Sequence, residues 1–228
     1  ENLALIPGKV GAAPVQHIGA YGCEAKDAIR SVEMFCTESL NTLVLNREHC
    51  AFGYRDSVFK RSLRGRVIIT SVRFALSRTP RPRLEYGDLA AEVEARGGIT
   101  LRNIREAVCA IRRAKLPDPA VTGNAGSFFK KPVVGREEAE RVSALYPDMP
   151  HYPAADPSQV KLAAGWLIDR AGLKGHSEGR VGIHPRQALV IINLGGATGT
   201  EIVAFARKVQ EQVKKRFGVE IEPEVNIL

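Results

Sequence analysis

Two kinds of hydrophobic spacing divide the chain into predicted strands and helices. Segments 28–46 and 66–76 are rich in β-branched residues with apolar positions at alternate places, which is typical of strands. A hairpin-like meander is expected between them, around residues 52–57. In segment 100–114 apolar residues recur every three or four positions and arginines lie on the other face, so this segment is predicted to be an amphipathic helix.

The second half of the chain mixes helices and strands less regularly. We predict helices over 136–146, 158–171 and 196–218. The last of them begins with a capping box, in which Thr198 precedes Glu201 by three positions. Residues 187–193 form an apolar run typical of a buried strand, and residues 218–228 alternate like a strand. Helices and strands without regular βαβ order predict the α+β class.

Proline and glycine interrupt both patterns in the middle of the chain. Residues 115–132 contain three prolines and two glycines, and we predict a domain boundary there. Residues 1–114 are expected to form the first region and residues 115–217 the second. The final strand, 218–228, is expected to return to the first region.

Composition and charge narrow the class of protein. With 228 residues, 44% hydrophobic and 25% charged, the chain can build a sizeable core and is not wholly disordered. No apolar run approaches the roughly 20 residues of a membrane span. Residues 60–115 carry 14 Lys and Arg against 5 Asp and Glu, whereas the whole chain has a net charge of +8. Such a segment is either a nucleic-acid footprint or a solvated surface, and its few aromatic residues favour the solvated surface.

The cysteines predict neither disulfides nor a metal site. Cys23, Cys36, Cys50 and Cys109 have no CxxC spacing and form no zinc ligand set with the five histidines. We therefore expect reduced thiols in a cytosolic protein, most of them small core residues.

Two candidate sites lie in the first half of the chain. The glycine-rich residues 1–22 can offer backbone N–H groups to a phosphate or let a flat ring lie against the chain, although a plain tight loop is the alternative. Arg55 can hold a carboxylate or stabilise developing negative charge, or it can form a surface ion pair with Asp56.

Two further candidates lie in the second half. Ser127 stands in a Gly/Asn loop without the GxSxG pattern of an activated nucleophile. It is either a proton or hydrogen-bond donor, or a turn serine bonded to its own backbone. Glu220, Glu222 and Glu224 share one strand face, which ordinarily means solvent; the alternative is that one of them acts as an acid in a site.

In their order along the chain, these motifs resemble one known family. ENLALIPGKVGAAPVQHIGAYG, FGYRDS, KLPDPAVTGNAGSFFKKP, VKLAAGWLID, HPRQALVIIN and EPEV are similar to UDP-N-acetylenolpyruvoylglucosamine reductases over essentially the whole sequence. The loop with Tyr152 resembles the form that carries an extra substrate-covering tyrosine loop. The resemblance implies that residues 1–114 and 218–228 belong to an FAD-binding α+β domain, and residues 115–217 to a smaller α+β substrate-binding domain.

The resemblance also implies a reaction in bacterial peptidoglycan precursor synthesis. NADPH reduces bound FAD, hydride passes to carbon 3 of the enolpyruvyl ether of UDP-N-acetylglucosamine, and carbon 2 is protonated. Ser127 is implied to be the proton donor, and Glu224 and Arg55 to stabilise the enolate-like intermediate. Charges placed there stabilise the transition state more than the ground state.

The same motifs imply the binding residues. The flavin-facing set comprises Gly8, Gly11, Gln16, Ile18, Gly19 and Arg112. The set that holds the UDP diphosphate and sugar comprises Lys115, Tyr152, Lys161, Tyr86 and Gln187. Trp166 is expected to be a core residue of its helix. We expect a cytoplasmic bacterial monomer without a nucleic-acid or membrane partner.

Three positions depart from the family pattern. His17 stands where Asn is more frequent, Lys131 replaces the usual Asn after SFFK, and Asn226 stands where many members have Arg. The part of the family with the glycine-rich FAD-pyrophosphate loop lies outside this sequence, so we expect these 228 residues alone to bind FAD poorly and to be inactive. The alternative, from another class, is a non-catalytic basic module that binds nucleic acid through residues 60–115.

Overall fold

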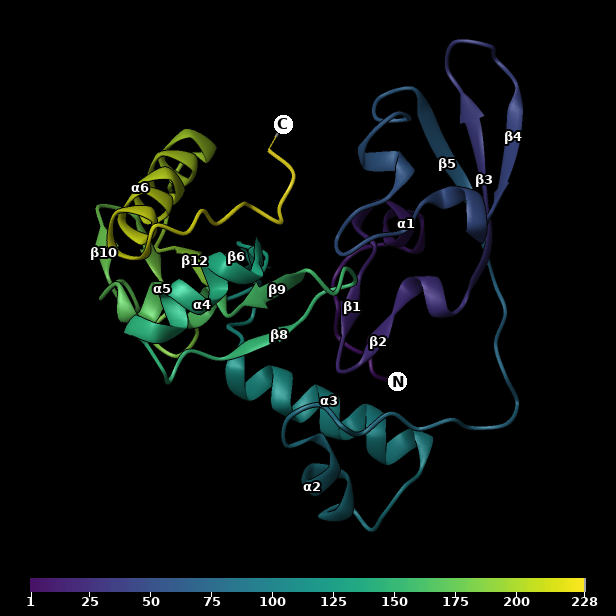
Figure 1. Ribbon diagram of the computed structural model, residues 1–228. Coiled ribbons are helices and arrows are strands. Elements are labelled where there is room, and N and C mark those ends of the chain that lie inside the picture. The colour runs from purple at the N-terminus through teal and green to yellow at the C-terminus, as the bar shows by residue number, and fades with distance from the viewer. Residues whose placement is uncertain (228) are drawn as a thin grey trace. The chain divides into compact units, whose positions relative to one another are not determined.

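The computed structural model describes residues 1–227, and the chain forms two compact units, Glu1–Arg112 and Arg113–Leu228 (Figure 1). Each unit combines helices with antiparallel sheets, which confirms the α+β class. The division falls near the end of helix α3 (Leu101–Lys115), just before the proline-rich segment. Each unit has a core of its own and is described separately.

The main sheet of the first unit has the strand order β4-β3-β5 (Figure 1). Its strands are β3 (Ile29–Cys36), β4 (Thr42–Asn46) and β5 (Val67–Phe74). Val32 of β3 faces Leu45 on one side and Val72 on the other, and it is completely buried. The strand predicted over 28–46 is therefore two strands, because the polar residues 37–41 turn the chain back on itself.

Short elements surround this sheet. In chain order they are η1 (Val10–Ala12), α1 (Ala13–Gln16), β1 (Gly19–Ala20), β2 (Cys23–Glu24), η2 (Ala25–Asp27), η3 (Arg47–Cys50) and η4 (Val58–Lys60). The meander expected at residues 52–57 is a tight loop closed by a single bridge between Gly53 and Asp56. Consistent with the glycine and proline content, residues 1–22 contain one turn of α-helix, one turn of 3-10 helix and the two-residue strand β1.

Two helices complete the first unit. Helix α2 (Leu89–Glu94) lies beside helix α3 (Figure 1). The two share an apolar cluster in which Leu89, Ile104 and Val108 are almost fully buried. The amphipathic helix predicted over 100–114 is confirmed. Its residues Arg102 and Arg105 are exposed, as expected for a solvated face.

The second unit contains two sheets and three helices. The sheets have the orders β10-β11-β12-β6 and β7-β9-β8. The strands are β6 (Gly123–Ser127), β7 (Val133–Gly135), β8 (His151–Pro153), β9 (Gln159–Leu162), β10 (Ser177–Glu178), β11 (Val181–Ile183) and β12 (Val190–Asn193). The helices are α4 (Arg136–Leu145), α5 (Ala164–Arg170) and α6 (Gly199–Phe217). Helix α6 packs against β11 and β12. The buried strand predicted over 187–193 is confirmed for residues 190–193, which form β12 (Figure 1).

Three predictions for the second unit are wrong. The helix predicted over 158–171 begins as β9 and becomes helical only at Ala164, because residues 159–162 pair with strands on both sides. The loop assigned to Ser127 is strand β6, held by β12 despite its glycines. Residues 218–227 are not a strand; they make one isolated bridge, Phe129 to Pro223, and proline has no N–H group to extend a ladder.

Helix α6 has the ends that the sequence predicts. The Thr198 hydroxyl accepts from the Glu201 N–H, and the Glu201 carboxylate accepts from the Thr198 N–H at 2.7 Å. The Thr198 N–H, the Thr198 hydroxyl, which donates to the same carboxylate at 2.8 Å, and the Arg180 guanidinium lower the pKa of Glu201 to about 2. Gly218 ends the helix in the left-handed conformation, at φ 72°. In residues 1–227 no helix, α6 included, is both long and apolar enough to cross a membrane.

The capping box gives a first test of this fold. Thr198→Ala removes the side-chain cap, so we expect the free energy of unfolding to fall by about 1 kcal/mol and Tm by roughly 2–4 °C. Thermal unfolding of the complete protein measures both. Thr200→Ala, at an exposed position inside the same helix, is the matched control and is expected to change stability by less than about 0.5 kcal/mol. Equal effects of the two substitutions would contradict the cap.

Candidate functional site

Ser127 and Glu224 are brought together by the backbone of the second unit. Ser127 ends β6, where it faces Val190 of β12. The next residue, Phe128, accepts a hydrogen bond of 2.7 Å from the Glu224 N–H through its carbonyl oxygen. Ser127 itself is exposed and Glu224 is half-buried. A serine hydroxyl and a carboxyl group therefore stand on adjacent backbone segments although 97 positions separate them in the sequence.

The core fixes this arrangement. Phe128 and Phe129 are 5% and 2% exposed and belong to the apolar cluster of the second unit. Lys130 adds a second backbone hydrogen bond, from its N–H to the Glu222 carbonyl oxygen at 3.0 Å. Buried aromatic anchors on one strand restrict how far the paired segment can shift.

The three terminal glutamates have different surroundings. The Glu220 carboxylate lies 2.5 Å from the Lys214 ammonium, and the Glu222 carboxylate lies 2.5 Å from the Lys130 ammonium. The side chains of these two glutamates are 71% and 68% exposed, so the ordinary interpretation as solvated carboxylates holds for them. Glu224 differs from them in its half-buried position. The interpretation as a solvated carboxylate therefore applies least to Glu224.

Tyr152 and Lys161 on the β8–β9 hairpin, with Lys131 from the segment before β7, form a basic group. Tyr152 of β8 faces Lys161 of β9 directly, and cross-strand partners present their side chains on the same face. The ammonium nitrogen of Lys131 lies 3.7 Å from the centroid of the Tyr152 ring. Two cations and a phenol hydroxyl in one place suit an anionic group such as a diphosphate. Part of the long loop predicted around Tyr152 is thus an ordered strand.

Gln187 is linked by hydrogen bonds to the backbone at the end of β6, whereas Lys115 stands at the end of α3. The Gln187 side-chain oxygen accepts from the Leu189 N–H at 3.5 Å, and the Leu189 carbonyl oxygen accepts from the Phe128 N–H at 2.7 Å. Gln187 therefore stands near the end of β6. Lys115 is the last, exposed residue of α3. Trp166 on α5 is half-buried against the apolar core, as expected.

The first unit contains a pocket of about 230 Å³ that three of the implied flavin-facing residues line, namely Gly8, Gln16 and Ile18. Its other lining residues are apolar except for Lys9. At Gly8 the backbone has φ 113° and the space that a Cβ would occupy is open. Apolar walls with little charge fit a flat aromatic ring such as that of a flavin better than a pyrophosphate.

Gly19 and Gly11 lie outside this lining. The Arg55 guanidinium donates to the Gly19 carbonyl oxygen at 2.6 Å. A Cβ at Gly19 would lie 3.0 Å from that guanidinium, so a larger residue would have to displace the guanidinium slightly. Arg55 has φ 55°, which is unusual for a residue with a side chain, and Asp56 pairs with Arg61 at 3.1 Å. Gly11 lies in η1.

Tyr21 is a residue that the sequence reasoning missed. Its ring meets Tyr86 edge-on with centroids 5.6 Å apart. Burial raises the pKa of Tyr21, and the neighbouring Arg112 opposes that rise. The Arg112 Nε atom is buried and, within residues 1–227, has no hydrogen-bond partner. Tyr21 thus lies beside Tyr86 and Arg112. The feature of the sequence that could have identified it is its position in the QHIGAYG motif.

The cysteines and other titratable groups suggest no metal site. All four cysteines are free thiols, with Cys50 and Cys109 buried. Burial raises the pKa of Cys50 to about 11, which keeps it protonated and inert. The described part of the chain holds no group of three or more His, Cys, Asp or Glu residues placed to bind a metal ion.

Comparison with known proteins gives this geometry its context. The family model of the UDP-N-acetylenolpyruvoylglucosamine reductase C-terminal domain matches residues 118–228. The UDP-N-acetylenolpyruvoylglucosamine reductase of Chromobacterium violaceum is 54% identical over 233 residues, a match that covers 100% of this chain and 67% of that protein. The chain belongs to the UDP-N-acetylenolpyruvoylglucosamine reductase family.

Other members agree with this assignment. The UDP-N-acetylenolpyruvoylglucosamine reductase of Pseudomonas aeruginosa is 51% identical and again covered to 67%. The solved structure of the reductase from Thermus caldophilus matches 99% of this chain and 62% of its own, with 26% identity and a TM-score of 0.62. The chain thus spans about two thirds of the length of these reductases.

The contact between Lys131 and the Tyr152 ring can be tested by substitution. Lys131→Met keeps the length of the side chain and removes its charge. We expect the amide hydrogens of β8 and β9 to exchange roughly two to five times faster, because a partly exposed cation–π contact contributes about 0.5–1 kcal/mol. Hydrogen exchange of the complete protein, read by mass spectrometry, measures this.

The neighbouring lysine supplies the control. Lys130→Met removes an ion pair with Glu222 and is expected to leave exchange in β8 and β9 unchanged. If both variants accelerate exchange in the hairpin equally, the contact between Lys131 and Tyr152 does not order it.

Proposed function

We propose that the complete protein reduces the enolpyruvyl ether of UDP-N-acetylglucosamine to UDP-N-acetylmuramate, with NADPH and FAD, in peptidoglycan precursor synthesis. The observation that carries the proposal is the backbone pairing that places Ser127 next to Glu224 in a member of this reductase family. A hydroxyl and a carboxyl group on adjacent backbone segments can serve one proton transfer and one charge-stabilising contact.

The residues of the first unit fit the proposed cofactor. Gly8, Gln16 and Ile18 would hold the flavin ring against the apolar pocket, where the open space at Gly8 admits a flat group. When bound, FAD supplies the hydride, which it takes from NADPH. Exclusion of water by the apolar lining would protect such a reaction.

Ser127 is proposed to protonate carbon 2 of the substrate. Addition of hydride to carbon 3 leaves negative charge on carbon 2 and on the adjoining carboxylate. An enolate of this kind is strongly basic, so a well-placed hydroxyl with an ordinary pKa can donate a proton to it. The exposed position of Ser127 at the end of a strand leaves its hydroxyl accessible to a substrate.

Glu224 and Arg55 are proposed to stabilise the charge that develops on the enolate. The Arg55 guanidinium can bind a carboxylate, and the Glu224 carboxyl group can take part in a charge-stabilising hydrogen bond. Both interactions strengthen as hydride arrives, because the negative charge grows in that step. The hydrogen bond to Gly19 holds the guanidinium in one orientation before the substrate binds.

The basic hairpin is proposed to hold the nucleotide. Lys161 and Tyr152 would bind the diphosphate, and the Lys131 ammonium supplies a further positive charge there. Lys115, Gln187 and Tyr86 complete the proposed contacts to the UDP-sugar. The free thiols are in keeping with a reducing compartment, the bacterial cytoplasm.

The nucleic-acid alternative has less support. Several arginines of segment 60–115 are engaged with carboxylates: Arg66 with Glu38, Arg83 with Asp27 and Arg96 with Glu92. A phosphate-binding surface needs its cations available to the backbone of the nucleic acid. These ion pairs favour a solvated surface.

The test of the proposed reaction is Ser127→Ala in the complete protein. We expect NADPH to reduce the flavin at nearly the wild-type rate, because that step does not use the hydroxyl. Formation of UDP-N-acetylmuramate should fall by roughly 10²–10⁴-fold, the usual contribution of a positioned proton donor. Stopped-flow absorbance and product analysis in D₂O separate the two steps.

Ser143→Ala in α4 serves as the control, since this half-buried serine has no proposed role. Both rates are expected to stay at wild-type values in that variant. Normal transfer of solvent deuterium to carbon 2 by Ser127→Ala would rule out the proposed role of Ser127.

A further inference from the structure

His17 is a fully buried histidine that the proposed reaction does not use. Helix α1 ends at this residue, whose backbone takes the left-handed conformation with φ 43°. Its side chain is 0% exposed and its ring stacks on Phe52, with centroids 5.0 Å apart and planes 25° from parallel. Burial of an ionisable ring costs free energy unless its polar atoms find hydrogen-bond partners. The partners of the two ring nitrogens therefore determine which form of the ring is stable.

The contacts of the ring define its tautomer. The Nδ1 atom contacts the Gly53 carbonyl oxygen, which can only accept, so Nδ1 carries a hydrogen. In the described residues the buried Nε2 atom has no hydrogen-bond partner. The Glu24 carboxylate lies 3.9 Å from Nε2. A neutral ring has only a lone pair there, and an ionised carboxylate has no hydrogen to offer it.

Three charged groups face the ring from the surrounding elements: Glu24 of β2, Lys26 of η2 and Arg55 of the loop that contains Gly53. Burial lowers the pKa of His17 below its usual 6.5, and Lys26 and Arg55 act in the same direction. The Gly53 carbonyl and Glu24 oppose the shift without reversing it. The ring is therefore neutral at pH 7.

The loop of residues 51–56 is held against the segment after α1 at two points. His17 contacts Gly53, and the Arg55 guanidinium donates to the Gly19 carbonyl oxygen at 2.6 Å. Ala51 and Arg55 both have positive φ angles, of 47° and 55°. Two backbone hydrogen bonds between Gly53 and Asp56, of 2.9 and 3.3 Å, close the loop. Such a conformation persists only where its surroundings enforce it.

We propose that His17 is the positioning residue for Arg55: the neutral ring fixes the loop of residues 51–56, and protonation draws Nε2 toward Glu24 and loosens that loop. The functional part of this inference rests on the proposed role of Arg55. The geometry of the loop is observed and does not depend on that role. Because the folded protein favours the neutral ring, the unfolded chain takes up the proton first as pH falls. The contribution of His17 is complete above about pH 6.5 and decreases below it.

Amide hydrogen exchange at Gly53 and Asp56 in the complete protein tests this directly, since these two N–H groups close the loop. After correction for intrinsic exchange, we expect wild-type protection to be constant above about pH 6.5 and to fall below it. Above about pH 6.5, His17→Ala should lower protection roughly tenfold relative to wild type, and its own profile should show no step. His17→Asn should restore much of the protection without the step, because Asn tolerates the left-handed backbone and has an amide donor for Gly53.

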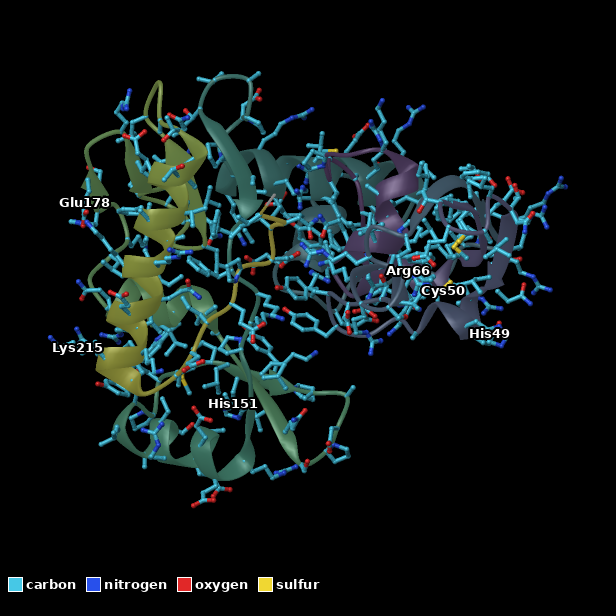
Figure 2. The ribbon with its side chains drawn as sticks, turned by 90° about the horizontal axis from the view of Figure 1, so that it is seen from above. His49, Cys50, Arg66, His151, Glu178 and Lys215 are labelled. Atoms are coloured by element: carbon cyan, nitrogen blue, oxygen red, sulfur yellow. The ribbon has the colours of Figure 1, made fainter. Side chains whose placement is uncertain are left out.

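The matched control is His49→Ala. His49 is an exposed histidine of η3 (Figure 2), and its loss is expected to leave both the protection and the step unchanged. A flat wild-type profile, or a step that survives in His17→Asn, would overturn the proposal. If His17→Ala does not fold, the wild-type and Asn profiles still decide. The measurement needs no turnover, so failure of the proposed reaction would not affect its outcome.

Discussion

The pairing of Phe128–Lys130 with Glu222–Glu224 is the constraint on which the second unit depends. Its hydrogen bonds connect the chain just after β6 with the chain just after α6. The apolar side chains on either side, Phe129 and Ile221, are 2% and 1% exposed, so the pairing is anchored in the core. Without it, Ser127 and Glu224 would have no reason to be neighbours. The proposed chemistry therefore depends on a tertiary contact that closes a loop of almost the whole unit.

The end of α6 makes that pairing possible. Gly218 takes a positive φ of 72°, and a Cβ there would meet the Arg141 guanidinium at 3.1 Å. The same guanidinium donates to the Phe217 carbonyl oxygen at 3.3 Å, which satisfies a free carbonyl at the helix end. The chain can then reverse and pair with residues 128–130, just after β6. The end of α6 at Gly218, which the sequence predicts, thus helps to set the position of Glu224.

In the first unit the corresponding constraint is the tie between the loop of Arg55 and the segment after α1. Gly19 allows the guanidinium to approach its backbone, and His17 fixes the other side of the loop. Both residues belong to the QHIGAYG motif, in which Gly19 lets the Arg55 guanidinium come close to the backbone, a role that neither a ligand site nor a plain tight loop had indicated. The motif is built for close approach of a side chain, in addition to any ligand.

The sequence predicted the elements whose signals are local. The amphipathic period of α3 and the capping box and terminal glycine of α6 do not depend on distant residues, and both helices are as expected. Strands β6 and β9 were missed because partners far along the chain decide them: glycine-rich residues 123–127 become a strand only beside β12. The last residues alternate like a strand but find no ladder beyond one bridge.

The candidate site could be predicted only in part, because its contacts join residues that are far apart in the sequence. The sequence motifs identified the candidate residues and the family. No local signal indicated that Lys131 would lie over the Tyr152 ring or that Tyr21 would lie beside Tyr86 and Arg112. Such contacts follow from how strands and helices pack. His17 was visible as a departure from the family pattern, yet its burial and its contact with Gly53 appear only in the fold.

The most direct measurement of the central claim is the absorbance of the flavin in the complete protein during one catalytic cycle. The account predicts that NADPH bleaches the flavin in the absence of air. Addition of the enolpyruvyl ether of UDP-N-acetylglucosamine should then restore the oxidised spectrum, with one UDP-N-acetylmuramate formed per flavin. A flavin that NADPH reduces but that this substrate does not reoxidise would contradict the account.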